Sequence, residues 1–304
     1  MEREMGLSDV HGSIVDVLLQ AHPGLSTTPS PVPLAALREP ASLAAKDGTS
    51  LVDYMFTQAP DERHAIAADP ARVVKEMDEW GIRTGLVVIE PENEERTLES
   101  LAAHPRRLYA ALRVDPHDGV QGTRRIERLV KNNDNIRALS LSPMAIYPFI
   151  SPNSKEYYVV YAKAIELGLP VYINVGIPGP RVPGDIQNPI HLDEVCWFFP
   201  DLVVVMRHGG EPWVDLCVKL LLKWPNLYYA TSAFSPRHYP KEIIEFANKR
   251  DASKVIYAGY WPTLSFERLF AELQQLPLRD HVWPKFFYEN ARRVFKMNDE
   301  DNDD

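Results

Sequence analysis

The sequence predicts an α/β fold of the (β/α)₈ TIM-barrel type, and three observations favour it. Short apolar runs of β type alternate with amphipathic stretches of helical spacing along the chain. Eight such runs occur, which is the number of parallel strands that closes a barrel. The glycine-rich phosphate loops GxGxxG and GxxxxGK[ST], which favour a doubly wound open sheet, do not occur.

The first half of the chain contains four of these runs. The first strand is expected in "SIVDVLL", residues 13–19, and a proline-rich excursion follows it at residues 22–42, where prolines prevent regular structure and distort the barrel. A helix is expected over residues 69–81, because Asp69 can cap it, Pro70 suits its first position and Gly81 suits its end. The next strands are expected at residues 84–90, 108–113 and 136–142, with a helix at 122–132 between the last two.

The second half of the chain repeats the alternation of helices and strands, with clearer boundaries between them. Helices are expected at residues 155–168, 191–199, 213–224 and 240–250. Strands are expected at residues 170–176, 202–208, 226–232 and 254–260. Each helix precedes a strand directly, as a parallel barrel requires.

Length and composition predict one domain. A chain of 304 residues that is 45% hydrophobic can bury a full core, and no linker divides it. We therefore expect a single barrel domain over residues 1–297 and an acidic, disordered tail, "NDEDNDD", over residues 298–304. The formal net charge is −9, and five of the acidic residues lie in this tail, so the rest of the chain carries −4.

Charge and composition also limit the partners. A mildly acidic surface argues against nucleic acid as a partner. No segment reaches the roughly 18 apolar residues that a membrane span needs, and the start of the chain lacks the apolar core of a signal peptide. Cys196 and Cys217 lie in apolar helical surroundings, where small buried side chains are more common than a disulfide. We expect a cytoplasmic protein with a small-molecule substrate and no membrane contact.

In a barrel, the loops that follow the strands converge on one opening, which we call the mouth, and active sites gather there. Polar or aromatic side chains stand at most of the expected strand ends. They are Asp16, Gln20, Glu90, Arg113, Asp115, Ser140, Ser142, Asn174, Arg207, His208, Thr231, Ser232 and Tyr260.

Three phrases carry a resemblance to a known family. They are "YYVVYAKAIELGLPVYINVG", "FPDLVVVMRHGG" and the closing "ENARRVF", in this order and spacing. With them, the chain resembles the amidohydrolase-related branch of the amidohydrolase superfamily, which contains aminocarboxymuconate-semialdehyde decarboxylase and related aromatic-acid decarboxylases and hydrolases. The resemblance implies a TIM barrel, a hydrolase or carbon–carbon lyase activity, and a homodimer.

The resemblance also implies a metal inside the barrel, whose ligand positions can be compared one by one. The family's Asp-x-His-x-His pattern at the first strand places Leu18 and Gln20 where histidines are usual. Asn174 takes the position of the histidine after strand five, His208 keeps the histidine after strand six, and Tyr260 replaces the aspartate after strand eight. Leucine cannot bind a metal, and neutral amides are poor substitutes for imidazole.

We therefore expect no metal site and no cofactor. An alternative alignment on "SDVHGS" keeps His11 and places Ser13 at the second histidine. On that alignment a weak divalent site, for instance for zinc, formed by His11, Asp16 and His208 stays open.

The site residues are assigned roles from their chemistry. His208 would transfer a proton, Arg207 would hold an anion, and Asn174 and Tyr260 would donate hydrogen bonds to a carbonyl. His208 at a strand end could equally hold only a neighbouring loop, and Tyr260 could simply fill space. Further substrate contacts are expected from Arg181, Gln20, Trp213, Trp261 and Ser232. Arg113 and Asp115 are expected to pair with each other as a structural lock.

Two functions of different class follow. In the first, the protein is a hydrolase or a carbon–carbon lyase such as a decarboxylase, acting on a small anionic, aromatic or β-oxo substrate without a firmly bound metal. In the second, it is a catalytically silent barrel that binds a metabolite or a partner protein, since one fold hosts both kinds of protein.

Overall fold

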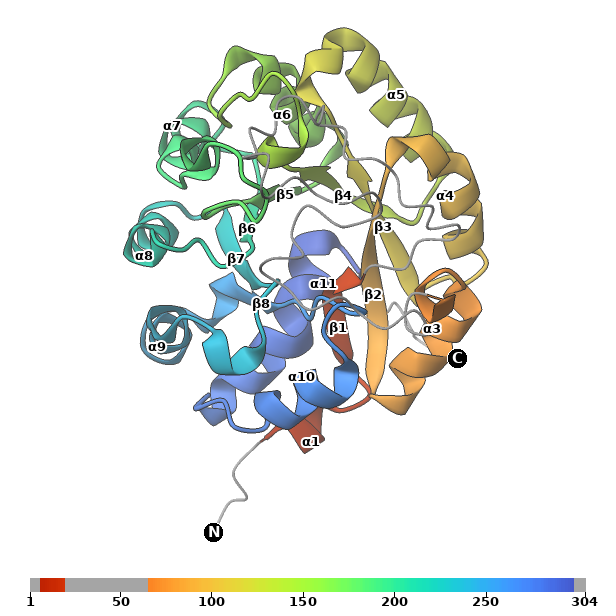
Figure 1. Ribbon diagram of the computed structural model, residues 1–304, viewed down its shortest axis with the longest axis vertical. Coiled ribbons are helices and arrows are strands. Elements are labelled where there is room, and N and C mark those ends of the chain that lie inside the picture. The colour runs from red at the N-terminus through yellow and green to blue at the C-terminus, as the bar shows by residue number, and fades with distance from the viewer. Residues whose placement is uncertain (1–5, 20–64, 298–304) are drawn as a thin grey trace, which may run out of the picture.

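The computed structural model describes residues 6–19 and 65–297 (Figure 1). Eight parallel strands follow one another around the sheet in chain order, which confirms the predicted barrel. The proline-rich excursion and the acidic tail lie outside the described residues. The strands are β1 (Ile14–Leu19), β2 (Ile82–Ile89), β3 (Leu108–Arg113), β4 (Ile136–Leu141), β5 (Val171–Asn174), β6 (Val204–Arg207), β7 (Leu227–Thr231) and β8 (Val255–Tyr257).

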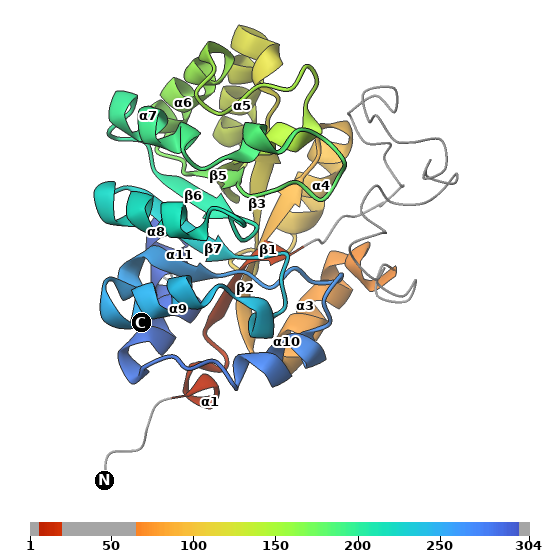
Figure 2. The same ribbon diagram turned by 60° about the vertical axis from the view of Figure 1, so that its left-hand side comes forward.

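The helices surround the strands on the outside, except for the last of them, which lies within the ring of strands (Figures 1 and 2). They are α1 (Leu7–Val10), α3 (Pro70–Glu79), α4 (Glu94–Ala102), α5 (Gly119–Asn132), α6 (Lys155–Leu167), α7 (His191–Phe198), α8 (Val214–Lys223), α9 (Lys241–Lys249), α10 (Phe266–Leu273) and α11 (Asn290–Phe295). None of the described helices combines the length and the hydrophobicity that crossing a bilayer needs.

The expected signals at the ends of α3 are confirmed. The Asp69 carboxylate accepts a hydrogen bond from the Ala71 N–H at 3.0 Å, and Pro70 occupies the first helical position. Gly81 follows the helix with a φ of +68°, a conformation that a side chain makes costly. The chain can therefore turn directly from α3 into β2.

The core has two layers on either side of the strands. One layer lies between the strands and the helices, and the other fills the barrel interior. Helix α11 contributes to the interior layer and is visible within the ring of strands in Figure 1. There Phe295, which is fully buried, packs edge-on against Tyr172 of β5 with ring centroids 5.8 Å apart. Cys196 and Cys217 are both buried and unpaired, as expected.

The barrel is least regular where β8 returns to β1. Seven strand pairs are joined by ladders, but Leu19 and Trp261 form an isolated bridge across this last gap. The Asp16 side chain adds a bond of its own: its Oδ1 accepts from the Gly259 N–H at 2.9 Å. We call this gap the seam.

The expected pairing of Arg113 with Asp115 is wrong. Arg113 instead pairs with Glu90 across the sheet, with Nη2 and Oε1 2.9 Å apart, and Asp115 binds the His117 ring at 2.7 Å. Arg113 ends β3 beside the end of β2, so the carboxylate of the neighbouring strand is the one within reach. Asp115 lies beyond the strand end and caps the following turn instead.

Replacing Phe295 by alanine tests the role of α11 in the interior. The change leaves a cavity where α11 meets β5, so we expect the free energy of unfolding to fall by about 3–5 kcal/mol. Denaturant titration followed by circular dichroism measures it. Val120→Ala on α5, where the side chain is 57% exposed, is the control and should change the value by less than about 0.5 kcal/mol. Equal effects of the two changes would contradict this packing.

Candidate active site

Strand register brings four polar side chains together at the mouth. In the β5–β6 ladder Asn174 lies opposite Arg207, and in the β3–β4 ladder Arg113 lies opposite Ser140. These residues end or nearly end their strands. Because neighbouring parallel strands lie under 5 Å apart, side chains at matching positions are in contact range.

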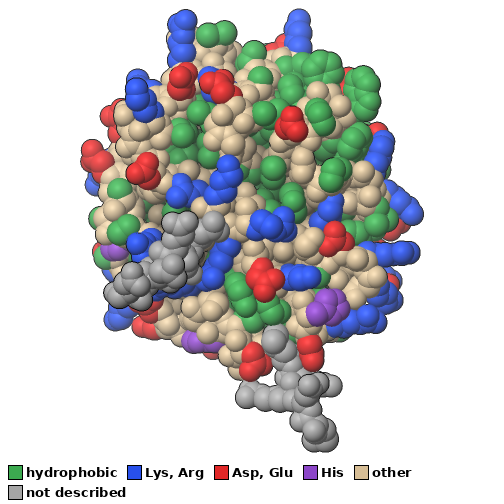
Figure 3. Space-filling model, turned by 180° about the vertical axis from the view of Figure 1, so that it is seen from behind, with side chains coloured by type: hydrophobic (Ala, Val, Ile, Leu, Met, Phe, Trp, Pro, Cys, Tyr) green, Lys and Arg blue, Asp and Glu red, His purple; other side chains and the backbone are tan. Residues whose placement is uncertain are grey.

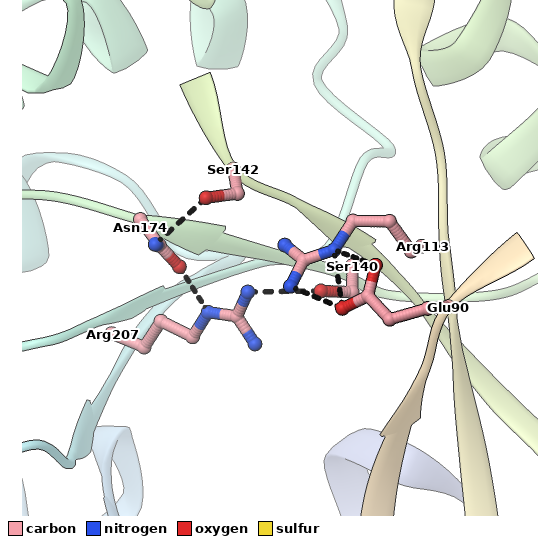
Figure 4. Close-up of polar contacts among 6 residues, drawn as sticks. All are labelled: Glu90, Arg113, Ser140, Ser142, Asn174 and Arg207. Atoms are coloured by element: carbon pink, nitrogen blue, oxygen red, sulfur yellow. Dashed lines mark hydrogen bonds and ion pairs between the residues drawn. The ribbon is translucent and has the colours of Figure 1, made fainter. Parts of the chain in front are cut away.

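Arg207 is the most deeply buried charged side chain of this group, with 2% of its surface exposed. Its Nε donates to Asn174 Oδ1, and its Nη2 donates to Ser140 Oγ at 2.9 Å (Figure 4). The guanidinium also lies over the Tyr172 ring, 4.6 Å from the centroid. All of these partners are neutral, so no carboxylate among the described residues pairs with Arg207.

Asn174 is fixed from both sides. Its Oδ1 accepts from Arg207, and its Nδ2 donates to Ser142 Oγ at 3.0 Å. The side-chain amide thus orients the guanidinium without neutralising its charge.

Arg113 brings a second guanidinium to the same place. Its Nε and Nη2 bind Glu90, whereas its Nη1 is buried and finds no hydrogen-bond partner among the residues that the structure describes. Figure 4 shows the Arg113 group between Arg207 and Glu90. Burial and the nearby charge of Arg113 lower the pKa of Arg207 to about 10. Two guanidinium groups and one carboxylate therefore meet here, and the positive charge is in excess.

His208 follows Arg207 directly and is half-buried. Its backbone N–H donates to Ser232 Oγ at 2.9 Å, and its Nδ1 lies 3.0 Å from the same oxygen. Burial, together with the charges of Arg207 and Arg113, holds the pKa of His208 well below its usual range. The imidazole is therefore neutral at neutral pH.

Tyr260 faces His208 across the mouth. The two rings are perpendicular, with centroids 5.6 Å apart. Tyr260 has a φ of +77° and His208 a φ of +72°, and Ala233 after β7 has a φ of +67°. Side chains other than glycine rarely adopt this conformation, and where they do the surrounding structure holds them there. The ends of β6, β7 and β8 thus share an unusual backbone at the mouth.

The other predicted site residues do not all lie at the mouth. Ser232 is buried beside His208, as described above. Trp261 is 1% exposed and stacks on Phe266 of α10 at 5.4 Å, so it belongs to the layer outside the strands. Trp213 at the start of α8 and Arg181 in the β5–α7 loop are half-buried. Gln20 lies outside the described residues. The roles assigned to them stay predictions.

His11, Asp16 and His208 do not come together. His11 precedes β1 and lies against Gly81, at the end of the barrel away from the mouth. Asp16 faces the layer outside the strands beside Tyr257, whereas His208 follows the far end of β6. The weak metal site proposed for these three residues is therefore wrong.

Sequence reasoning missed the Glu90–Arg113 pair and the two serines that hold the Arg207–Asn174 pair. All four residues stand at predicted strand ends, so their place at the mouth was visible in the sequence. Which of them touch depends on cross-strand register, which the sequence pattern does not contain.

Comparison with known proteins gives both a family match and a set of similar folds. A family model described as amidohydrolase matches residues 52–297. No protein of curated function matches the sequence significantly.

Among solved structures, an uncharacterized TIM-barrel protein from Bordetella bronchiseptica is 20% identical, with a TM-score of 0.71 over 93% of this chain and 98% of that one. A dihydroxybenzoic acid decarboxylase from a Polaromonas species, with bound manganese and the inhibitor 2-nitroresorcinol, is 17% identical, with a TM-score of 0.62 over 78% of this chain and 89% of that one. A 5-carboxyvanillate decarboxylase from Novosphingobium aromaticivorans, also with bound manganese, is 16% identical, with a TM-score of 0.65 over 97% of this chain and all of that one. At these identities the likeness is one of fold.

The bound manganese in the two decarboxylases contradicts the expectation that no cofactor takes part. A divalent metal at the mouth of this barrel would need side chains there that are free to bind it. Leu18 is buried in the interior layer, Asn174 Oδ1 is taken by a guanidinium, and His208 Nδ1 lies on Ser232.

Within residues 6–19 and 65–297, no group of three His, Cys, Asp or Glu side chains is placed to hold a metal ion. The described side chains therefore do not fit a divalent metal bound by imidazoles and carboxylates.

Asn174→Asp tests whether the charge of Arg207 is uncompensated. A carboxylate at this position would pair with the buried guanidinium, so we expect the free energy of unfolding at pH 7 to rise by about 1–2 kcal/mol. Chemical denaturation measures the change. Asn132→Asp makes the same substitution on an exposed side chain and should shift the value by less than about 0.5 kcal/mol. A lower stability of Asn174→Asp than of the control would contradict the charge imbalance.

Proposed function

The chain belongs to the amidohydrolase family, and on that premise we propose that it is a carbon–carbon lyase that removes carbon dioxide from a small aromatic or β-oxo acid. The observation that carries this proposal is the excess positive charge of Arg207 and Arg113 at the mouth. The acids on which the two similar decarboxylases act are aromatic carboxylates, which are anions of the class that such a site would take.

An anion fits between the two guanidinium groups on chemical grounds. Within residues 6–19 and 65–297, Nη1 of Arg113 is buried with no acceptor, and the bonds of Arg207 leave its own Nη1 without a partner. A buried donor without an acceptor costs about 1–3 kcal/mol, more when it is charged, and a bound oxyanion recovers this cost. Arginine suits this role because its planar donors match carboxylate and phenolate oxygens.

The two charges would act most strongly as the reaction proceeds. In a β-oxo acid, the bond from the α-carbon to the carboxylate breaks, carbon dioxide leaves, and the electron pair moves onto the oxo oxygen to give an enolate. In an aromatic acid whose neighbouring hydroxyl is ionised, the ring carbon first takes a proton and the phenolate becomes a carbonyl; carbon dioxide then leaves, and the electron pair returns to the ring and restores the phenolate. Arg207 and Arg113, held in a dry and fixed geometry, stabilise that developing oxyanion. Asn174 and Ser140 contribute by keeping the guanidinium in place.

A proton must also reach the carbon that bears the carboxylate, after carbon dioxide leaves a β-oxo acid and before it leaves an aromatic acid. We assign this step to Tyr260, whose ring lies 5.6 Å from that of His208, the residue that follows Arg207. The Tyr260 O–H gives its proton to the carbon, the phenolate is stabilised by the adjacent cation, and water restores the proton. His208, being neutral, would donate or accept a hydrogen bond beside it.

The low basicity of His208 favours a lyase over a hydrolase. Hydrolysis needs a base that takes a proton from water, and an imidazole whose pKa lies well below its usual range is a weak base. Decarboxylation needs an anion site and a proton donor, which the mouth offers in Arg207 and Tyr260.

We also propose a homodimer in the cytoplasm. Trp197 at the end of α7 is 70% exposed and Phe198 beside it 53%, and Phe198 packs on Tyr158 of α6 with centroids 5.1 Å apart. Figure 3 shows hydrophobic side chains gathered over α6 and α7 on this side of the molecule. Exposed aromatic clusters of this kind are typical of protein interfaces. The two unpaired cysteines fit a reducing compartment.

Binding of 2,6-dihydroxybenzoate tests the anion site. We expect Arg207→Gln to weaken binding at pH 7 by about 10- to 100-fold, because a charged hydrogen bond contributes about 1.5–3 kcal/mol. Isothermal titration calorimetry, with and without manganese, measures the affinity, and trapped carbon dioxide measures turnover.

Two controls separate charge from shape. Resorcinol, which lacks the carboxylate, should bind weakly to both proteins, and Arg72→Gln on the outer face of α3 should leave binding unchanged. If 2,6-dihydroxybenzoate and other aromatic and β-oxo acids all fail to bind the unaltered protein, the silent-barrel alternative replaces this proposal.

Trp197→Glu tests the dimer. A charge in the aromatic cluster should prevent association, so light scattering after gel filtration should give the mass of one chain, while Val120→Glu on α5 keeps the mass of two. A single-chain mass for the unaltered protein at tens of micromolar would contradict the proposed dimer.

A further inference from the structure

Asp16 occupies a position that the proposed reaction does not explain. It lies in the middle of β1, it is completely buried, and its side chain faces the layer outside the strands rather than the mouth. Burial raises the pKa of Asp16 to about 7, although two backbone N–H groups bind its carboxylate. A buried ionisable group is costly, so its presence calls for a reason.

The contacts of Asp16 all lie at the seam. Its Oδ1 accepts from the Leu18 N–H at 3.0 Å within β1 and from the Gly259 N–H at 2.9 Å just beyond β8. No ladder joins these two strands, and Leu19 and Trp261 form only an isolated bridge. The carboxyl group therefore supplies a bond between strand ends that the backbone ladders leave unconnected.

This bond leads directly to the site. Gly259 precedes Tyr260, and the Tyr260 N–H donates to the Leu18 carbonyl at 3.3 Å. Two successive peptide groups after β8 are thus held to β1, one by the Asp16 side chain and one by the Leu18 backbone. Tyr260, whose N–H makes the second of these bonds, is also the residue with the unusual φ of +77°.

The space around Gly259 is too small for a side chain, because the Asp16 carboxyl group lies against it. A Cβ added to Gly259 would lie 2.5 Å from Asp16 Oδ2 and 2.7 Å from the Tyr257 hydroxyl oxygen, closer than atoms can approach. The glycine therefore lets the chain approach Asp16 closely. Asp16 Oδ2 and the Tyr257 hydroxyl are both buried, and neither has a hydrogen-bond partner in the described part of the chain.

We propose that Asp16 is a positioning residue, which closes the barrel at the seam and thereby sets the place of Tyr260 at the mouth. This inference rests on the proposed function, in which Tyr260 gives the proton. Asp16 acts through Gly259 and does not touch the substrate. The groups that hold the anion, Arg113 and Arg207, lie on β3 and β6 and are independent of it.

The protonation state of Asp16 gives the seam a pH dependence. Among the described residues, the ionisable groups on the side that the carboxyl faces are the phenols of Tyr239 and Tyr257, and the Tyr172 phenol in the interior layer also senses its charge. Because the pKa in the folded protein is raised above the value of 3.8 for an exposed group, the folded state binds the proton more tightly than the unfolded state. The stability that this provides is complete below pH 3.8 and is lost as the pH rises through 7.

Two substitutions at Asp16 test the inference. Asp16→Asn keeps the oxygen that accepts from Gly259 and carries no charge, whereas Asp16→Leu removes the acceptor. We expect Asp16→Leu to lower kcat for decarboxylation by roughly 100-fold through displacement of Tyr260, with the Kd for 2,6-dihydroxybenzoate changed by less than about threefold. Asp16→Asn should restore most of kcat and should remove the fall in stability between about pH 4 and pH 7. Equal losses of kcat and affinity in Asp16→Leu would overturn the inference.

A readout without turnover separates this inference from the proposed function. Hydrogen exchange, followed by mass spectrometry, should speed up in Asp16→Leu at residues 255–264, remain unchanged over β3 to β6, and return to the original rate in Asp16→Asn. Unchanged exchange at residues 255–264 in a folded Asp16→Leu protein would overturn the positioning role even if no acid is turned over. Faster exchange together with no binding of any acid would uphold the role of Asp16 and reject the proposed function.

Discussion

The buried charge of Arg207 is the feature around which the mouth is arranged. A guanidinium with 2% of its surface exposed loses most of its hydration. Contacts with an amide, a serine hydroxyl and an aromatic face offset part of the lost hydration free energy. None of these partners carries a negative charge. Arg113 adds a second cation whose own carboxylate, Glu90, is turned to its far side (Figure 4). Burying two cations with a single carboxylate costs free energy, and a bound anion would offset that cost.

The fold explains how such a site can persist. The positions of Asn174 and Arg207, and of Arg113 and Ser140, are fixed by the ladders between their strands, so the cations cannot move apart. The interior layer and α11 fill the barrel beneath them and hold Tyr172 under the guanidinium. The opposite side of the mouth, at the seam, depends instead on a side chain. There the backbone ladder stops, and Asp16 connects β1 to the segment that carries Tyr260.

The fold was predictable from the sequence, because alternating apolar runs and helix signals such as Asp69, Pro70 and Gly81 are local. Their order around the barrel follows from parallel connections. The mouth residues were predictable in part, since Arg207, His208, Asn174 and Tyr260 stand at strand ends. Their partners were not. The sequence favours Asp115, two residues away, as the partner of Arg113, whereas cross-strand register gives it Glu90. Trp261 and Asp16 face the layer outside the strands, and the residue pattern near an irregular strand end does not determine that direction.

A crystal structure with bound 2,6-dihydroxybenzoate would test the central claim most directly. The account predicts an anionic oxygen of the ligand within hydrogen-bond distance of both Arg207 and Arg113, with its ring near Tyr260 and His208. A ligand whose anionic oxygens contact neither guanidinium would contradict the account, whether it lies elsewhere in the barrel or is held at the mouth by other groups.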